Sequence, residues 1–368
     1  MTQLYAAARR WLGPLALGAL ALPAAAQSTT APKYSNEFLN LGVGARALGM
    51  GKVQVGLADD ATAGYWNPAG LANQIHKYDG VLMHSELFSG IVKNDYAAFS
   101  MPLDNKSAIG VSIMRLGVDN IADTRNLINE YGYIQYDKIT YFSVADYAML
   151  LSYARKIGQV EGLTVGANAK IVYRNVGSFA NAYGFGVDLG LQYRHKGWQL
   201  GLTARDVTTT FTAWSVNADY YRSAVLYGSN DPIPSNRNEI TLPRLVLGVG
   251  RQFKLPQQFT ALVAMDLETT TDGRRGTLVS TGVVSVDPRA GVELGYKNLV
   301  FLRGGAGNFQ KINDFSGARP WKGQYSLGAG VALSGLRVDL ALSRLAVEAL
   351  GQSSQTNSLI VSLGYSFK

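Results

Sequence analysis

Residues 183–194 read YGFGVDLGLQYR. Every second residue of this stretch is large and apolar, from Tyr183 to Tyr193, and the residues between them are small, polar or charged. Because successive side chains of a β-strand point to opposite faces, the stretch predicts a strand with one apolar and one polar face. An aromatic residue at each end of the apolar face is typical of strands that cross a membrane, where rings sit at headgroup level.

Two further stretches show the same alternation. Residues 163–174 read LTVGANAKIVYR, with Val172 the one apolar exception on the polar face, and residues 358–367 read SLIVSLGYSF. A soluble barrel or sandwich, with its polar face turned to water, is the alternative interpretation of this pattern. The spacing of the strands along the chain favours a membrane barrel.

From Val81 onward the chain divides into about fourteen strand-length runs, separated by gaps that alternate short and long. The runs span residues 81–88, 94–103, 107–116, 147–156, 163–174, 183–194, 198–206, 243–254, 258–267, 289–296, 299–306, 324–333, 336–344 and 358–367. The short gaps are the turns 104–106, 157–162, 195–197, 255–257, 297–298 and 334–335. The long gaps include residues 117–146, 207–242, 268–288 and 307–323. Short turns at one end, long loops at the other and an even strand number are the rule for outer-membrane barrels. We therefore predict an all-β fold, an antiparallel transmembrane β-barrel of about 14 strands over residues 81–368.

Composition agrees with a single barrel. No apolar span of 18 residues follows residue 30, and the chain has 41 glycines, 20 tyrosines and a mean hydropathy of +0.02. The net charge is +8, but the basic residues fall on polar strand faces, in loops and in turns, and acids such as Asp188 and Asp339 accompany them. We predict a lumen of mixed charge and no nucleic-acid surface, which would gather basic residues with aromatics on one patch.

The first residues predict export. Arg9 and Arg10 precede an apolar stretch at 11–22, and three alanines at 24–26 provide a cleavage site, so residues 1–26 are predicted to be a cleaved signal peptide. The arginine pair also allows a twin-arginine signal, although the rest of that motif is missing. The chain has no cysteine, so no disulfide holds the fold together.

The segment before the barrel, residues 27–80, carries the most specific motifs. It contains NEFLNLGVGARALGMG at 36–51, VGLADDATA at 55–63 and YWNPAGL at 65–71. This segment resembles the N-terminal part of the PorV/PorQ family, outer-membrane proteins of the type IX secretion system of Bacteroidota and members of the FadL-like class of fourteen-stranded barrels. The resemblance implies a hatch folded inside the lumen, with an Asn-Pro-Ala element in it. Lys52 departs from the family pattern, which has a small residue there.

The residues of this segment also suit a hatch on physical grounds. Its glycines permit positive φ angles and close approach to the wall, Asn67-Pro68 begins a turn, and Asp59 and Asp60 can cap a short helix or pair with Arg46 or lumen cations. The predicted hatch residues are Gly42, Gly44, Arg46, Gly49, Gly51, Asp59, Asp60, Asn67, Pro68 and Gly70.

Enzymatic signals are weak. Residues 42–47 match a relaxed dinucleotide fingerprint, but no parallel strand–helix unit surrounds them. The three histidines, His76, His84 and His195, are scattered, with His84 interpreted as a lumen or interface residue. We expect no catalytic residue, no cofactor and no metal.

Two functions remain open. By resemblance, the protein is a non-enzymatic secretion component that binds or shuttles cargo at the surface of a Gram-negative cell, with the type IX translocon barrel and secreted C-terminal-domain cargo as partners. The long loops would then be the docking surface, because aromatic residues are the usual anchors of interfaces; the same residues could instead pack loop on loop as a lid. The candidate contacts are Tyr133, Tyr136, Phe142, Phe211, Trp214, Tyr220 and Trp321.

The alternative is a FadL-like channel for hydrophobic small molecules in the outer membrane, with lipid or detergent bound in the lumen. Such a channel needs a movable hatch and an opening in the wall where a strand is kinked. Pro102 and Pro243 lie near the ends of their predicted strands, so the sequence predicts no kink.

Overall fold

The computed structural model describes residues 35–367 except Glu130, 221–236, Arg274, Gly282, 312–317, Arg319 and 350–351. The predicted signal peptide lies outside the described residues.

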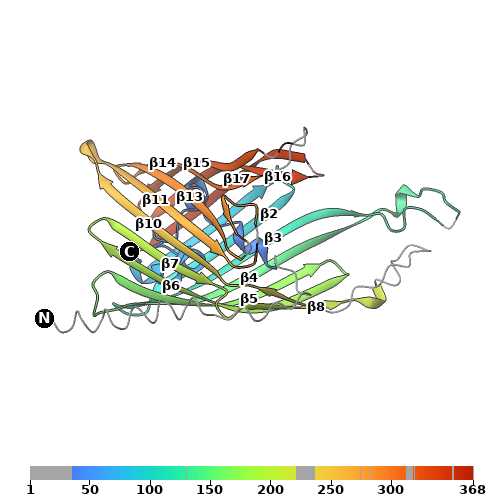
Figure 1. Ribbon diagram of the computed structural model, residues 1–368, viewed down its shortest axis with the longest axis horizontal. Coiled ribbons are helices and arrows are strands. Elements are labelled where there is room, and N and C mark those ends of the chain that lie inside the picture. Colours follow the sequence, from blue (N-terminus) through green and yellow to red (C-terminus); the bar gives the residue numbers. More distant parts are fainter. Residues whose placement is uncertain are drawn as a thin grey trace. The chain divides into compact units, whose positions relative to one another are not determined.

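Most of the described chain forms one antiparallel sheet (Figure 1). The strands are β1 (Tyr78–Leu87), β2 (Val92–Pro102), β3 (Ser107–Asp123), β4 (Thr140–Lys156), β5 (Leu163–Val176), β6 (Ala180–His195), β7 (Trp198–Arg205), β8 (Thr210–Val216), β9 (Asn238–Thr241), β10 (Arg244–Lys254), β11 (Phe259–Thr270), β12 (Val279–Ser280), β13 (Ser285–Tyr296), β14 (Val300–Lys311), β15 (Trp321–Leu333), β16 (Leu336–Ala349) and β17 (Gln352–Phe367). Most neighbours in sequence pair with each other, and β1 pairs with both β2 and β17. The sheet is therefore closed into a barrel, in which pairing around the ring replaces the two edges of an open sheet.

Two of the wall strands are interrupted. β7 and β8 both pair with β6, so together they form one strand of the wall. β9 pairs with β8 and β10 pairs with β7, so β9 and β10 together form the next strand of the wall. Counting each couple once, and leaving out the two-residue β12, gives fourteen wall strands. The prediction of a fourteen-stranded antiparallel barrel is confirmed.

Exposure along the strands follows the predicted alternation. In β6, Tyr183 and Phe185 are 63% and 56% exposed, whereas Gly184 and Asp188 between and beyond them are buried. The large apolar side chains thus point outward, and the small and polar ones point into the barrel.

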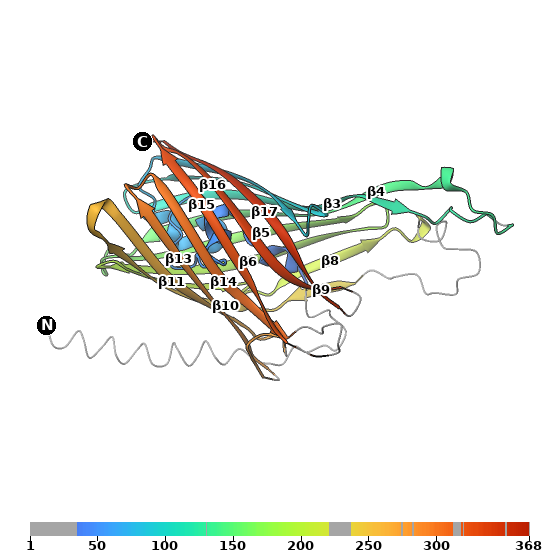
Figure 2. The same cartoon turned by 90° about the horizontal axis from the view of Figure 1, so that it is seen from above.

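The two ends of the barrel differ as predicted, but the long loops are shorter than expected. β3 and β4 have 17 residues each and extend beyond the other strands, as both views show (Figures 1 and 2). Their loop shrinks from 117–146 to 124–139, and β8 and β9 occupy parts of the predicted loop 207–242. The polar composition of these strand ends hid them, because they lie beyond the apolar band on which the period-two pattern depends.

Short helices occupy the chain before the barrel: η1 (Glu37–Asn40), α2 (Ala45–Gly49), α3 (Ala63–Trp66) and η2 (Pro68–Asn73). Figures 1 and 2 show these helices, in blue, within the ring of strands. α2 lies against β14 to β17, and η2 lies against β2 to β6. Two single turns, η3 (Tyr136–Lys138) and η4 (Pro256–Gln258), lie in the loops. No helix among the described residues is long and apolar enough to cross a membrane.

Candidate functional site: the inner segment and the interrupted wall

Residues 35–76, here called the inner segment, fit against glycines of the wall. A side chain at Gly305 would place its Cβ 2.1 Å from the backbone carbon of Met50, and one at Gly201 would lie 2.3 Å from the carbonyl oxygen of Val55. A Cβ at Gly190 would come within 2.1 Å of the side-chain oxygen of Asn67. Gly305 and Gly201 let two backbones touch, and Gly190 leaves room for the Asn67 side chain, where any larger residue would separate the inner segment from the wall.

The predicted glycines of the inner segment have two roles. Gly42, Gly44 and Gly51 have φ angles of +91°, +82° and +70°, which L-residues with a side chain rarely adopt. Gly49 packs against the backbone of Gly328 in β15, and a Cβ at Gly70 would lie 2.2 Å from the carbonyl oxygen of Ala58. The first three therefore serve the path of the chain, and the last two serve close packing.

Asn67 and Pro68 fix the turn between α3 and η2. The Asn67 side-chain nitrogen donates to the carbonyl oxygens of Val55 (2.9 Å) and Leu191 (3.1 Å), and its oxygen accepts from the Ala69 N–H. Pro68 occupies the first position of η2, where a missing N–H has no cost. One side chain thus ties together two parts of the inner segment and the wall strand β6.

Arg46 connects the inner segment to a chain of charges on the wall. Its guanidinium donates two hydrogen bonds to the Glu293 carboxylate, at 2.9 and 3.0 Å. Glu293 also accepts from Arg303, and Arg303 donates to Asp339 at 2.7 Å. Because Glu293, Arg303 and Asp339 are buried, each charge depends on the next for compensation.

Asp59 and Asp60 form the second charged connection. Asp59 pairs with Arg194 of β6 at 3.1 Å and lies 3.9 Å from Arg46. Asp60 accepts from Arg337 of β16 and, at 2.9 Å, from the Thr62 N–H near the start of α3. Burial raises the pKa of Asp60, but Arg337, the Thr62 hydroxyl and Arg46 together outweigh burial and hold that pKa below its usual range. Asp60 therefore stays ionised and holds the inner segment to the wall.

Lys52 is a basic residue of the inner segment whose burial opposes docking against the wall. Its ammonium group donates to the Asn40 carbonyl oxygen at 3.2 Å, and its neighbourhood contains Arg289 and Glu268. Burial, assisted by the charge of Arg289, lowers the pKa of Lys52 from 10.5 to about 8.

A pH dependence follows from the lowered pKa of Lys52. Between about pH 8 and pH 10 the undocked lysine holds its proton while the docked one has lost it, so raising the pH through this window strengthens docking. Protease protection of the inner segment should rise over this range in the wild type. Lys52→Met should flatten the curve, and an unchanged curve in this variant would assign the effect to other groups.

The interruptions of the two neighbouring wall strands lie at the same level. Arg205 pairs with Arg244 on one side of the gap, and Thr210 pairs with Thr241 on the other. Between them residues 206–209 and 242–243 have no partner in the facing strand, with Asp206 and Thr209 at φ angles of 55° and 59°, and the Val207 N–H still donates to the Val187 carbonyl oxygen of β6 at 2.9 Å. The predicted strand 243–254 corresponds to β10, which begins at Arg244, but β9 precedes it in the same wall strand. The expectation that the wall has no kink at Pro243 is therefore wrong, and Pro243 lacks the N–H that would continue the ladder.

Buried charges and aromatic rings face the gap from inside. The Lys170 ammonium donates to Asp188 at 3.0 Å and to Asp206 at 2.6 Å. The Arg205 guanidinium lies 5.0 Å from the ring of Tyr65 and 5.8 Å from that of Trp66, both on the inner segment. The inner segment and the gap therefore meet at an aromatic pair.

The aromatic residues predicted for the long loops divide into two groups. Tyr133 and Tyr136 lie in the β3–β4 loop and are 71% and 72% exposed. Tyr220 follows β8, and its hydroxyl accepts from Arg125 at 2.7 Å. The predicted loop placement is wrong for the other four residues, which lie in strands: Phe142 in β4, Phe211 and Trp214 in β8, and Trp321 in β15. Their contact with a partner stays a prediction.

Sequence reasoning did not single out Glu293, Arg303 or Asp266. Asp266, in β11, accepts from the backbone N–H groups of Gln54 (2.9 Å) and Val55 (3.1 Å). Each of the three is a charge at an inward position of a strand, and that alternation was the available signal.

The acidic residues and histidines of the described part of the chain do not gather into a metal site. No group of three or more His, Asp or Glu residues there is placed to hold a metal ion. His84 points outward, where its ring nitrogen lies 2.7 Å from Asp95.

Comparisons with known proteins bear on the fold. No protein-family model matches the chain, and no curated protein sequence matches it. The toluene transporter TodX of Pseudomonas putida superposes with a TM-score of 0.57 at 16% identity, covering 88% of this chain and 98% of TodX. The toluene transporter TbuX of Ralstonia pickettii gives 0.51 at 14% identity, covering 89% and 99%. A Pseudomonas aeruginosa FadL homologue gives 0.52 at 12%, covering 89% and 98%. The chain has the fold of FadL-like outer-membrane barrels.

Proposed function

We propose that this protein is an outer-membrane channel for hydrophobic small molecules in a Gram-negative cell. The inner segment is its hatch, and the gap at residues 206–209 and 242–243 is its opening toward the lipid. The observation that carries the proposal is the interruption of two adjacent wall strands at one level, opposite the ring pair of Tyr65 and Trp66.

The physical reason lies in the cost of crossing water. A hydrophobic molecule that leaves the lumen sideways passes from an aromatic contact into hydrocarbon, without entering the aqueous periplasm. The buried rings of Tyr65 and Trp66 lie behind the Arg205 guanidinium at the gap, so movement of the inner segment would bring an aromatic surface to it. Lys170 with its two aspartates keeps the interrupted strand in place. The likeness to proteins named as toluene transporters supports this proposal over the others.

A disulfide at the edge of the gap, between the two strands that border it, tests the route. The chain has no cysteine, so the double variant Thr210→Cys/Thr241→Cys contains a single pair of cysteines, and these lie at directly opposed positions of two neighbouring strands. We expect wild-type cells to take up radiolabelled toluene or oleic acid above the vector background. The oxidised variant should lose most of this uptake, and reduction with dithiothreitol should restore it.

The matched control places a disulfide elsewhere in the wall. The hydroxyl oxygens of Ser326 and Ser343, on β15 and β16, lie 3.5 Å apart, so Ser326→Cys/Ser343→Cys should oxidise without affecting uptake. Wild-type uptake at the vector level would refute the channel itself. Equal uptake by the oxidised and reduced gap variant would refute the route.

We keep a second candidate, a secretion component of the type IX kind that binds cargo at the cell surface. The β3–β4 hairpin favours it, because it extends beyond the barrel and exposes Tyr131, Tyr133, Tyr136 and Tyr141. Affinity purification from the native membrane tests this role. Recovery of a large translocon barrel or of secreted C-terminal-domain cargo would support it, and normal surface delivery of such cargo in a deletion strain would refute it.

A further inference from the structure

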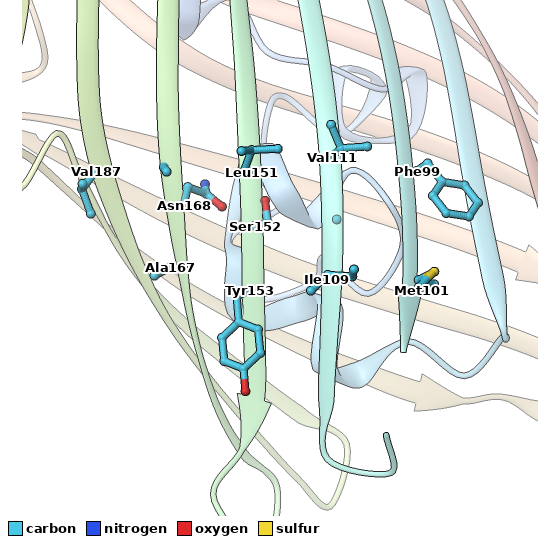
Figure 3. A pocket seen from close by; sticks show the side chains of 12 residues that line it. Phe99, Met101, Ile109, Val111, Leu151, Ser152, Tyr153, Ala167, Asn168 and Val187 are labelled. Carbon is cyan, nitrogen blue, oxygen red and sulfur yellow. The ribbon is translucent and has the colours of Figure 1, made fainter. Parts of the chain in front are cut away.

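The outer face of the wall carries two adjoining apolar hollows. The first, of about 600 Å³, spans β2 to β6 and is lined by residues that include Phe99, Val111, Leu151 and Ala169 (Figure 3). The second, of about 510 Å³, spans β4 to β7 and is lined mainly by leucines, alanines and glycines. Both are bounded by Tyr153 and Ala167, so they lie side by side on one surface.

Strand register explains why the surface is hollow here. One row across the wall runs from Phe99 through Val111, Leu151 and Ala169 to Val187. The two alanines of β5, at positions 167 and 169, are the smallest outward side chains among the large neighbours of β4 and β6. Close-packed surfaces leave a groove where small residues stand between large ones, and in a membrane only lipid can fill it.

Basic residues gather at the end of these hollows where the short turns lie. Arg155 follows Tyr153 by two residues on the same face, about 7 Å further along β4, and is exposed. Lys106 and Lys156 are adjacent, since the Lys156 N–H donates to the Lys106 carbonyl oxygen at 2.7 Å. Lys196 lies in a neighbouring turn between β6 and β7.

Acidic residues at this rim are fewer. Asp104 and Glu161 are the acids of the same turns, against the four basic residues. Asp104 already accepts from the backbone N–H groups of Lys106 and Ser107, at 2.6 and 2.7 Å. The rim therefore keeps an excess of positive charge beside the hollows.

We infer that this surface binds one anionic diacyl phospholipid of the periplasmic leaflet, with its two acyl chains in the two hollows and its phosphate against Arg155 and Lys106. Two adjoining apolar hollows match two chains, and a basic rim at one end matches a charged headgroup. Short turns face the periplasm in outer-membrane barrels, and that leaflet supplies the phospholipid. The site is separate from the proposed transport route and does not depend on it.

Native mass spectrometry of the full chain, refolded in detergent with equal amounts of phosphatidylglycerol and phosphatidylcholine, tests the site. We expect the wild type to retain one phosphatidylglycerol in preference to phosphatidylcholine. Arg155→Gln and Lys106→Gln should each reduce the preference about fivefold. Lys297→Gln, at the same rim but away from the hollows, should leave it unchanged.

A variant that fills the first hollow distinguishes lipid bound at this site from lipid that coats the whole outer surface of the barrel. Ala169→Phe should remove the retained lipid of either headgroup, whereas Ala329→Phe, on the outward face of β15, should not. Heat-dependent gel mobility shows that each variant has formed its barrel. Equal retention by the two phenylalanine variants, or no preference between the two lipids in the wild type, would overturn the inference.

Discussion

Replacing Gly305 by valine should expel the inner segment from the barrel, while replacing its neighbour Gly304 by valine should leave the inner segment in place. A Cβ at Gly305 would lie 2.1 Å from a backbone atom of Met50, which no rotamer can relieve. A Cβ at Gly304 points the other way, with its nearest neighbour, in Val292, at 3.8 Å. Overpacking against a flexible side chain costs roughly 1–3 kcal/mol, and contact with backbone should exceed this.

Two measurements compare these adjacent variants. Protease should cut the inner segment of Gly305→Val quickly in the purified protein, and planar bilayers should show ion conductance that the wild type lacks. Gly304→Val should behave like the wild type in both, with both variants keeping the heat-dependent gel mobility of a closed barrel. Full protection of the inner segment in Gly305→Val would contradict the glycine fit.

Arg46→Gln should free the inner segment without weakening the wall, whereas Glu293→Gln should do both. In Arg46→Gln the Glu293 carboxylate keeps its hydrogen bond from Arg303, so the charges of the wall remain compensated. In Glu293→Gln both Arg46 and Arg303 lose a partner in a buried site, a change that typically costs roughly 3–5 kcal/mol.

Protease protection measures whether the inner segment stays docked, and thermal unfolding measures the stability of the wall. Both variants should lose protection, but only Glu293→Gln should show a clear drop in Tm. Glu161→Gln, in an exposed turn, is the control and should change neither. Equal Tm values for the Arg46 and Glu293 variants would contradict the shared role of Glu293.

The wall was predictable because its signal is local. Period-two alternation in stretches such as 183–194, together with tight turns, specifies strands, their faces and their antiparallel order without knowledge of distant contacts. The resemblance of residues 36–71 to one family pointed to the FadL-like class, whose fold the structure has.

Partners across the lumen were not predictable in the same way. Arg46 meets Glu293 across 247 positions, and Asn67 meets Leu191 across 124, so only the closed barrel brings them together. The gap in the wall was missed because β8 and β9 are short and polar-flanked, and Pro243 looked like the start of a strand. Strand extensions beyond the apolar band, at Phe142 and Trp321, were missed for a related reason.

Photolabelling tests the lateral route most directly. A hydrophobic diazirine analogue of oleic acid, added to cells expressing the wild type and irradiated, should label residues bordering the gap, among them Val207 and Leu242, and excess unlabelled oleic acid should suppress this labelling. The oxidised Thr210→Cys/Thr241→Cys variant should retain label on the lumen side at Tyr65 and Trp66. Labelling confined to the outer face of the barrel, and insensitive to competitor, would contradict passage through the wall.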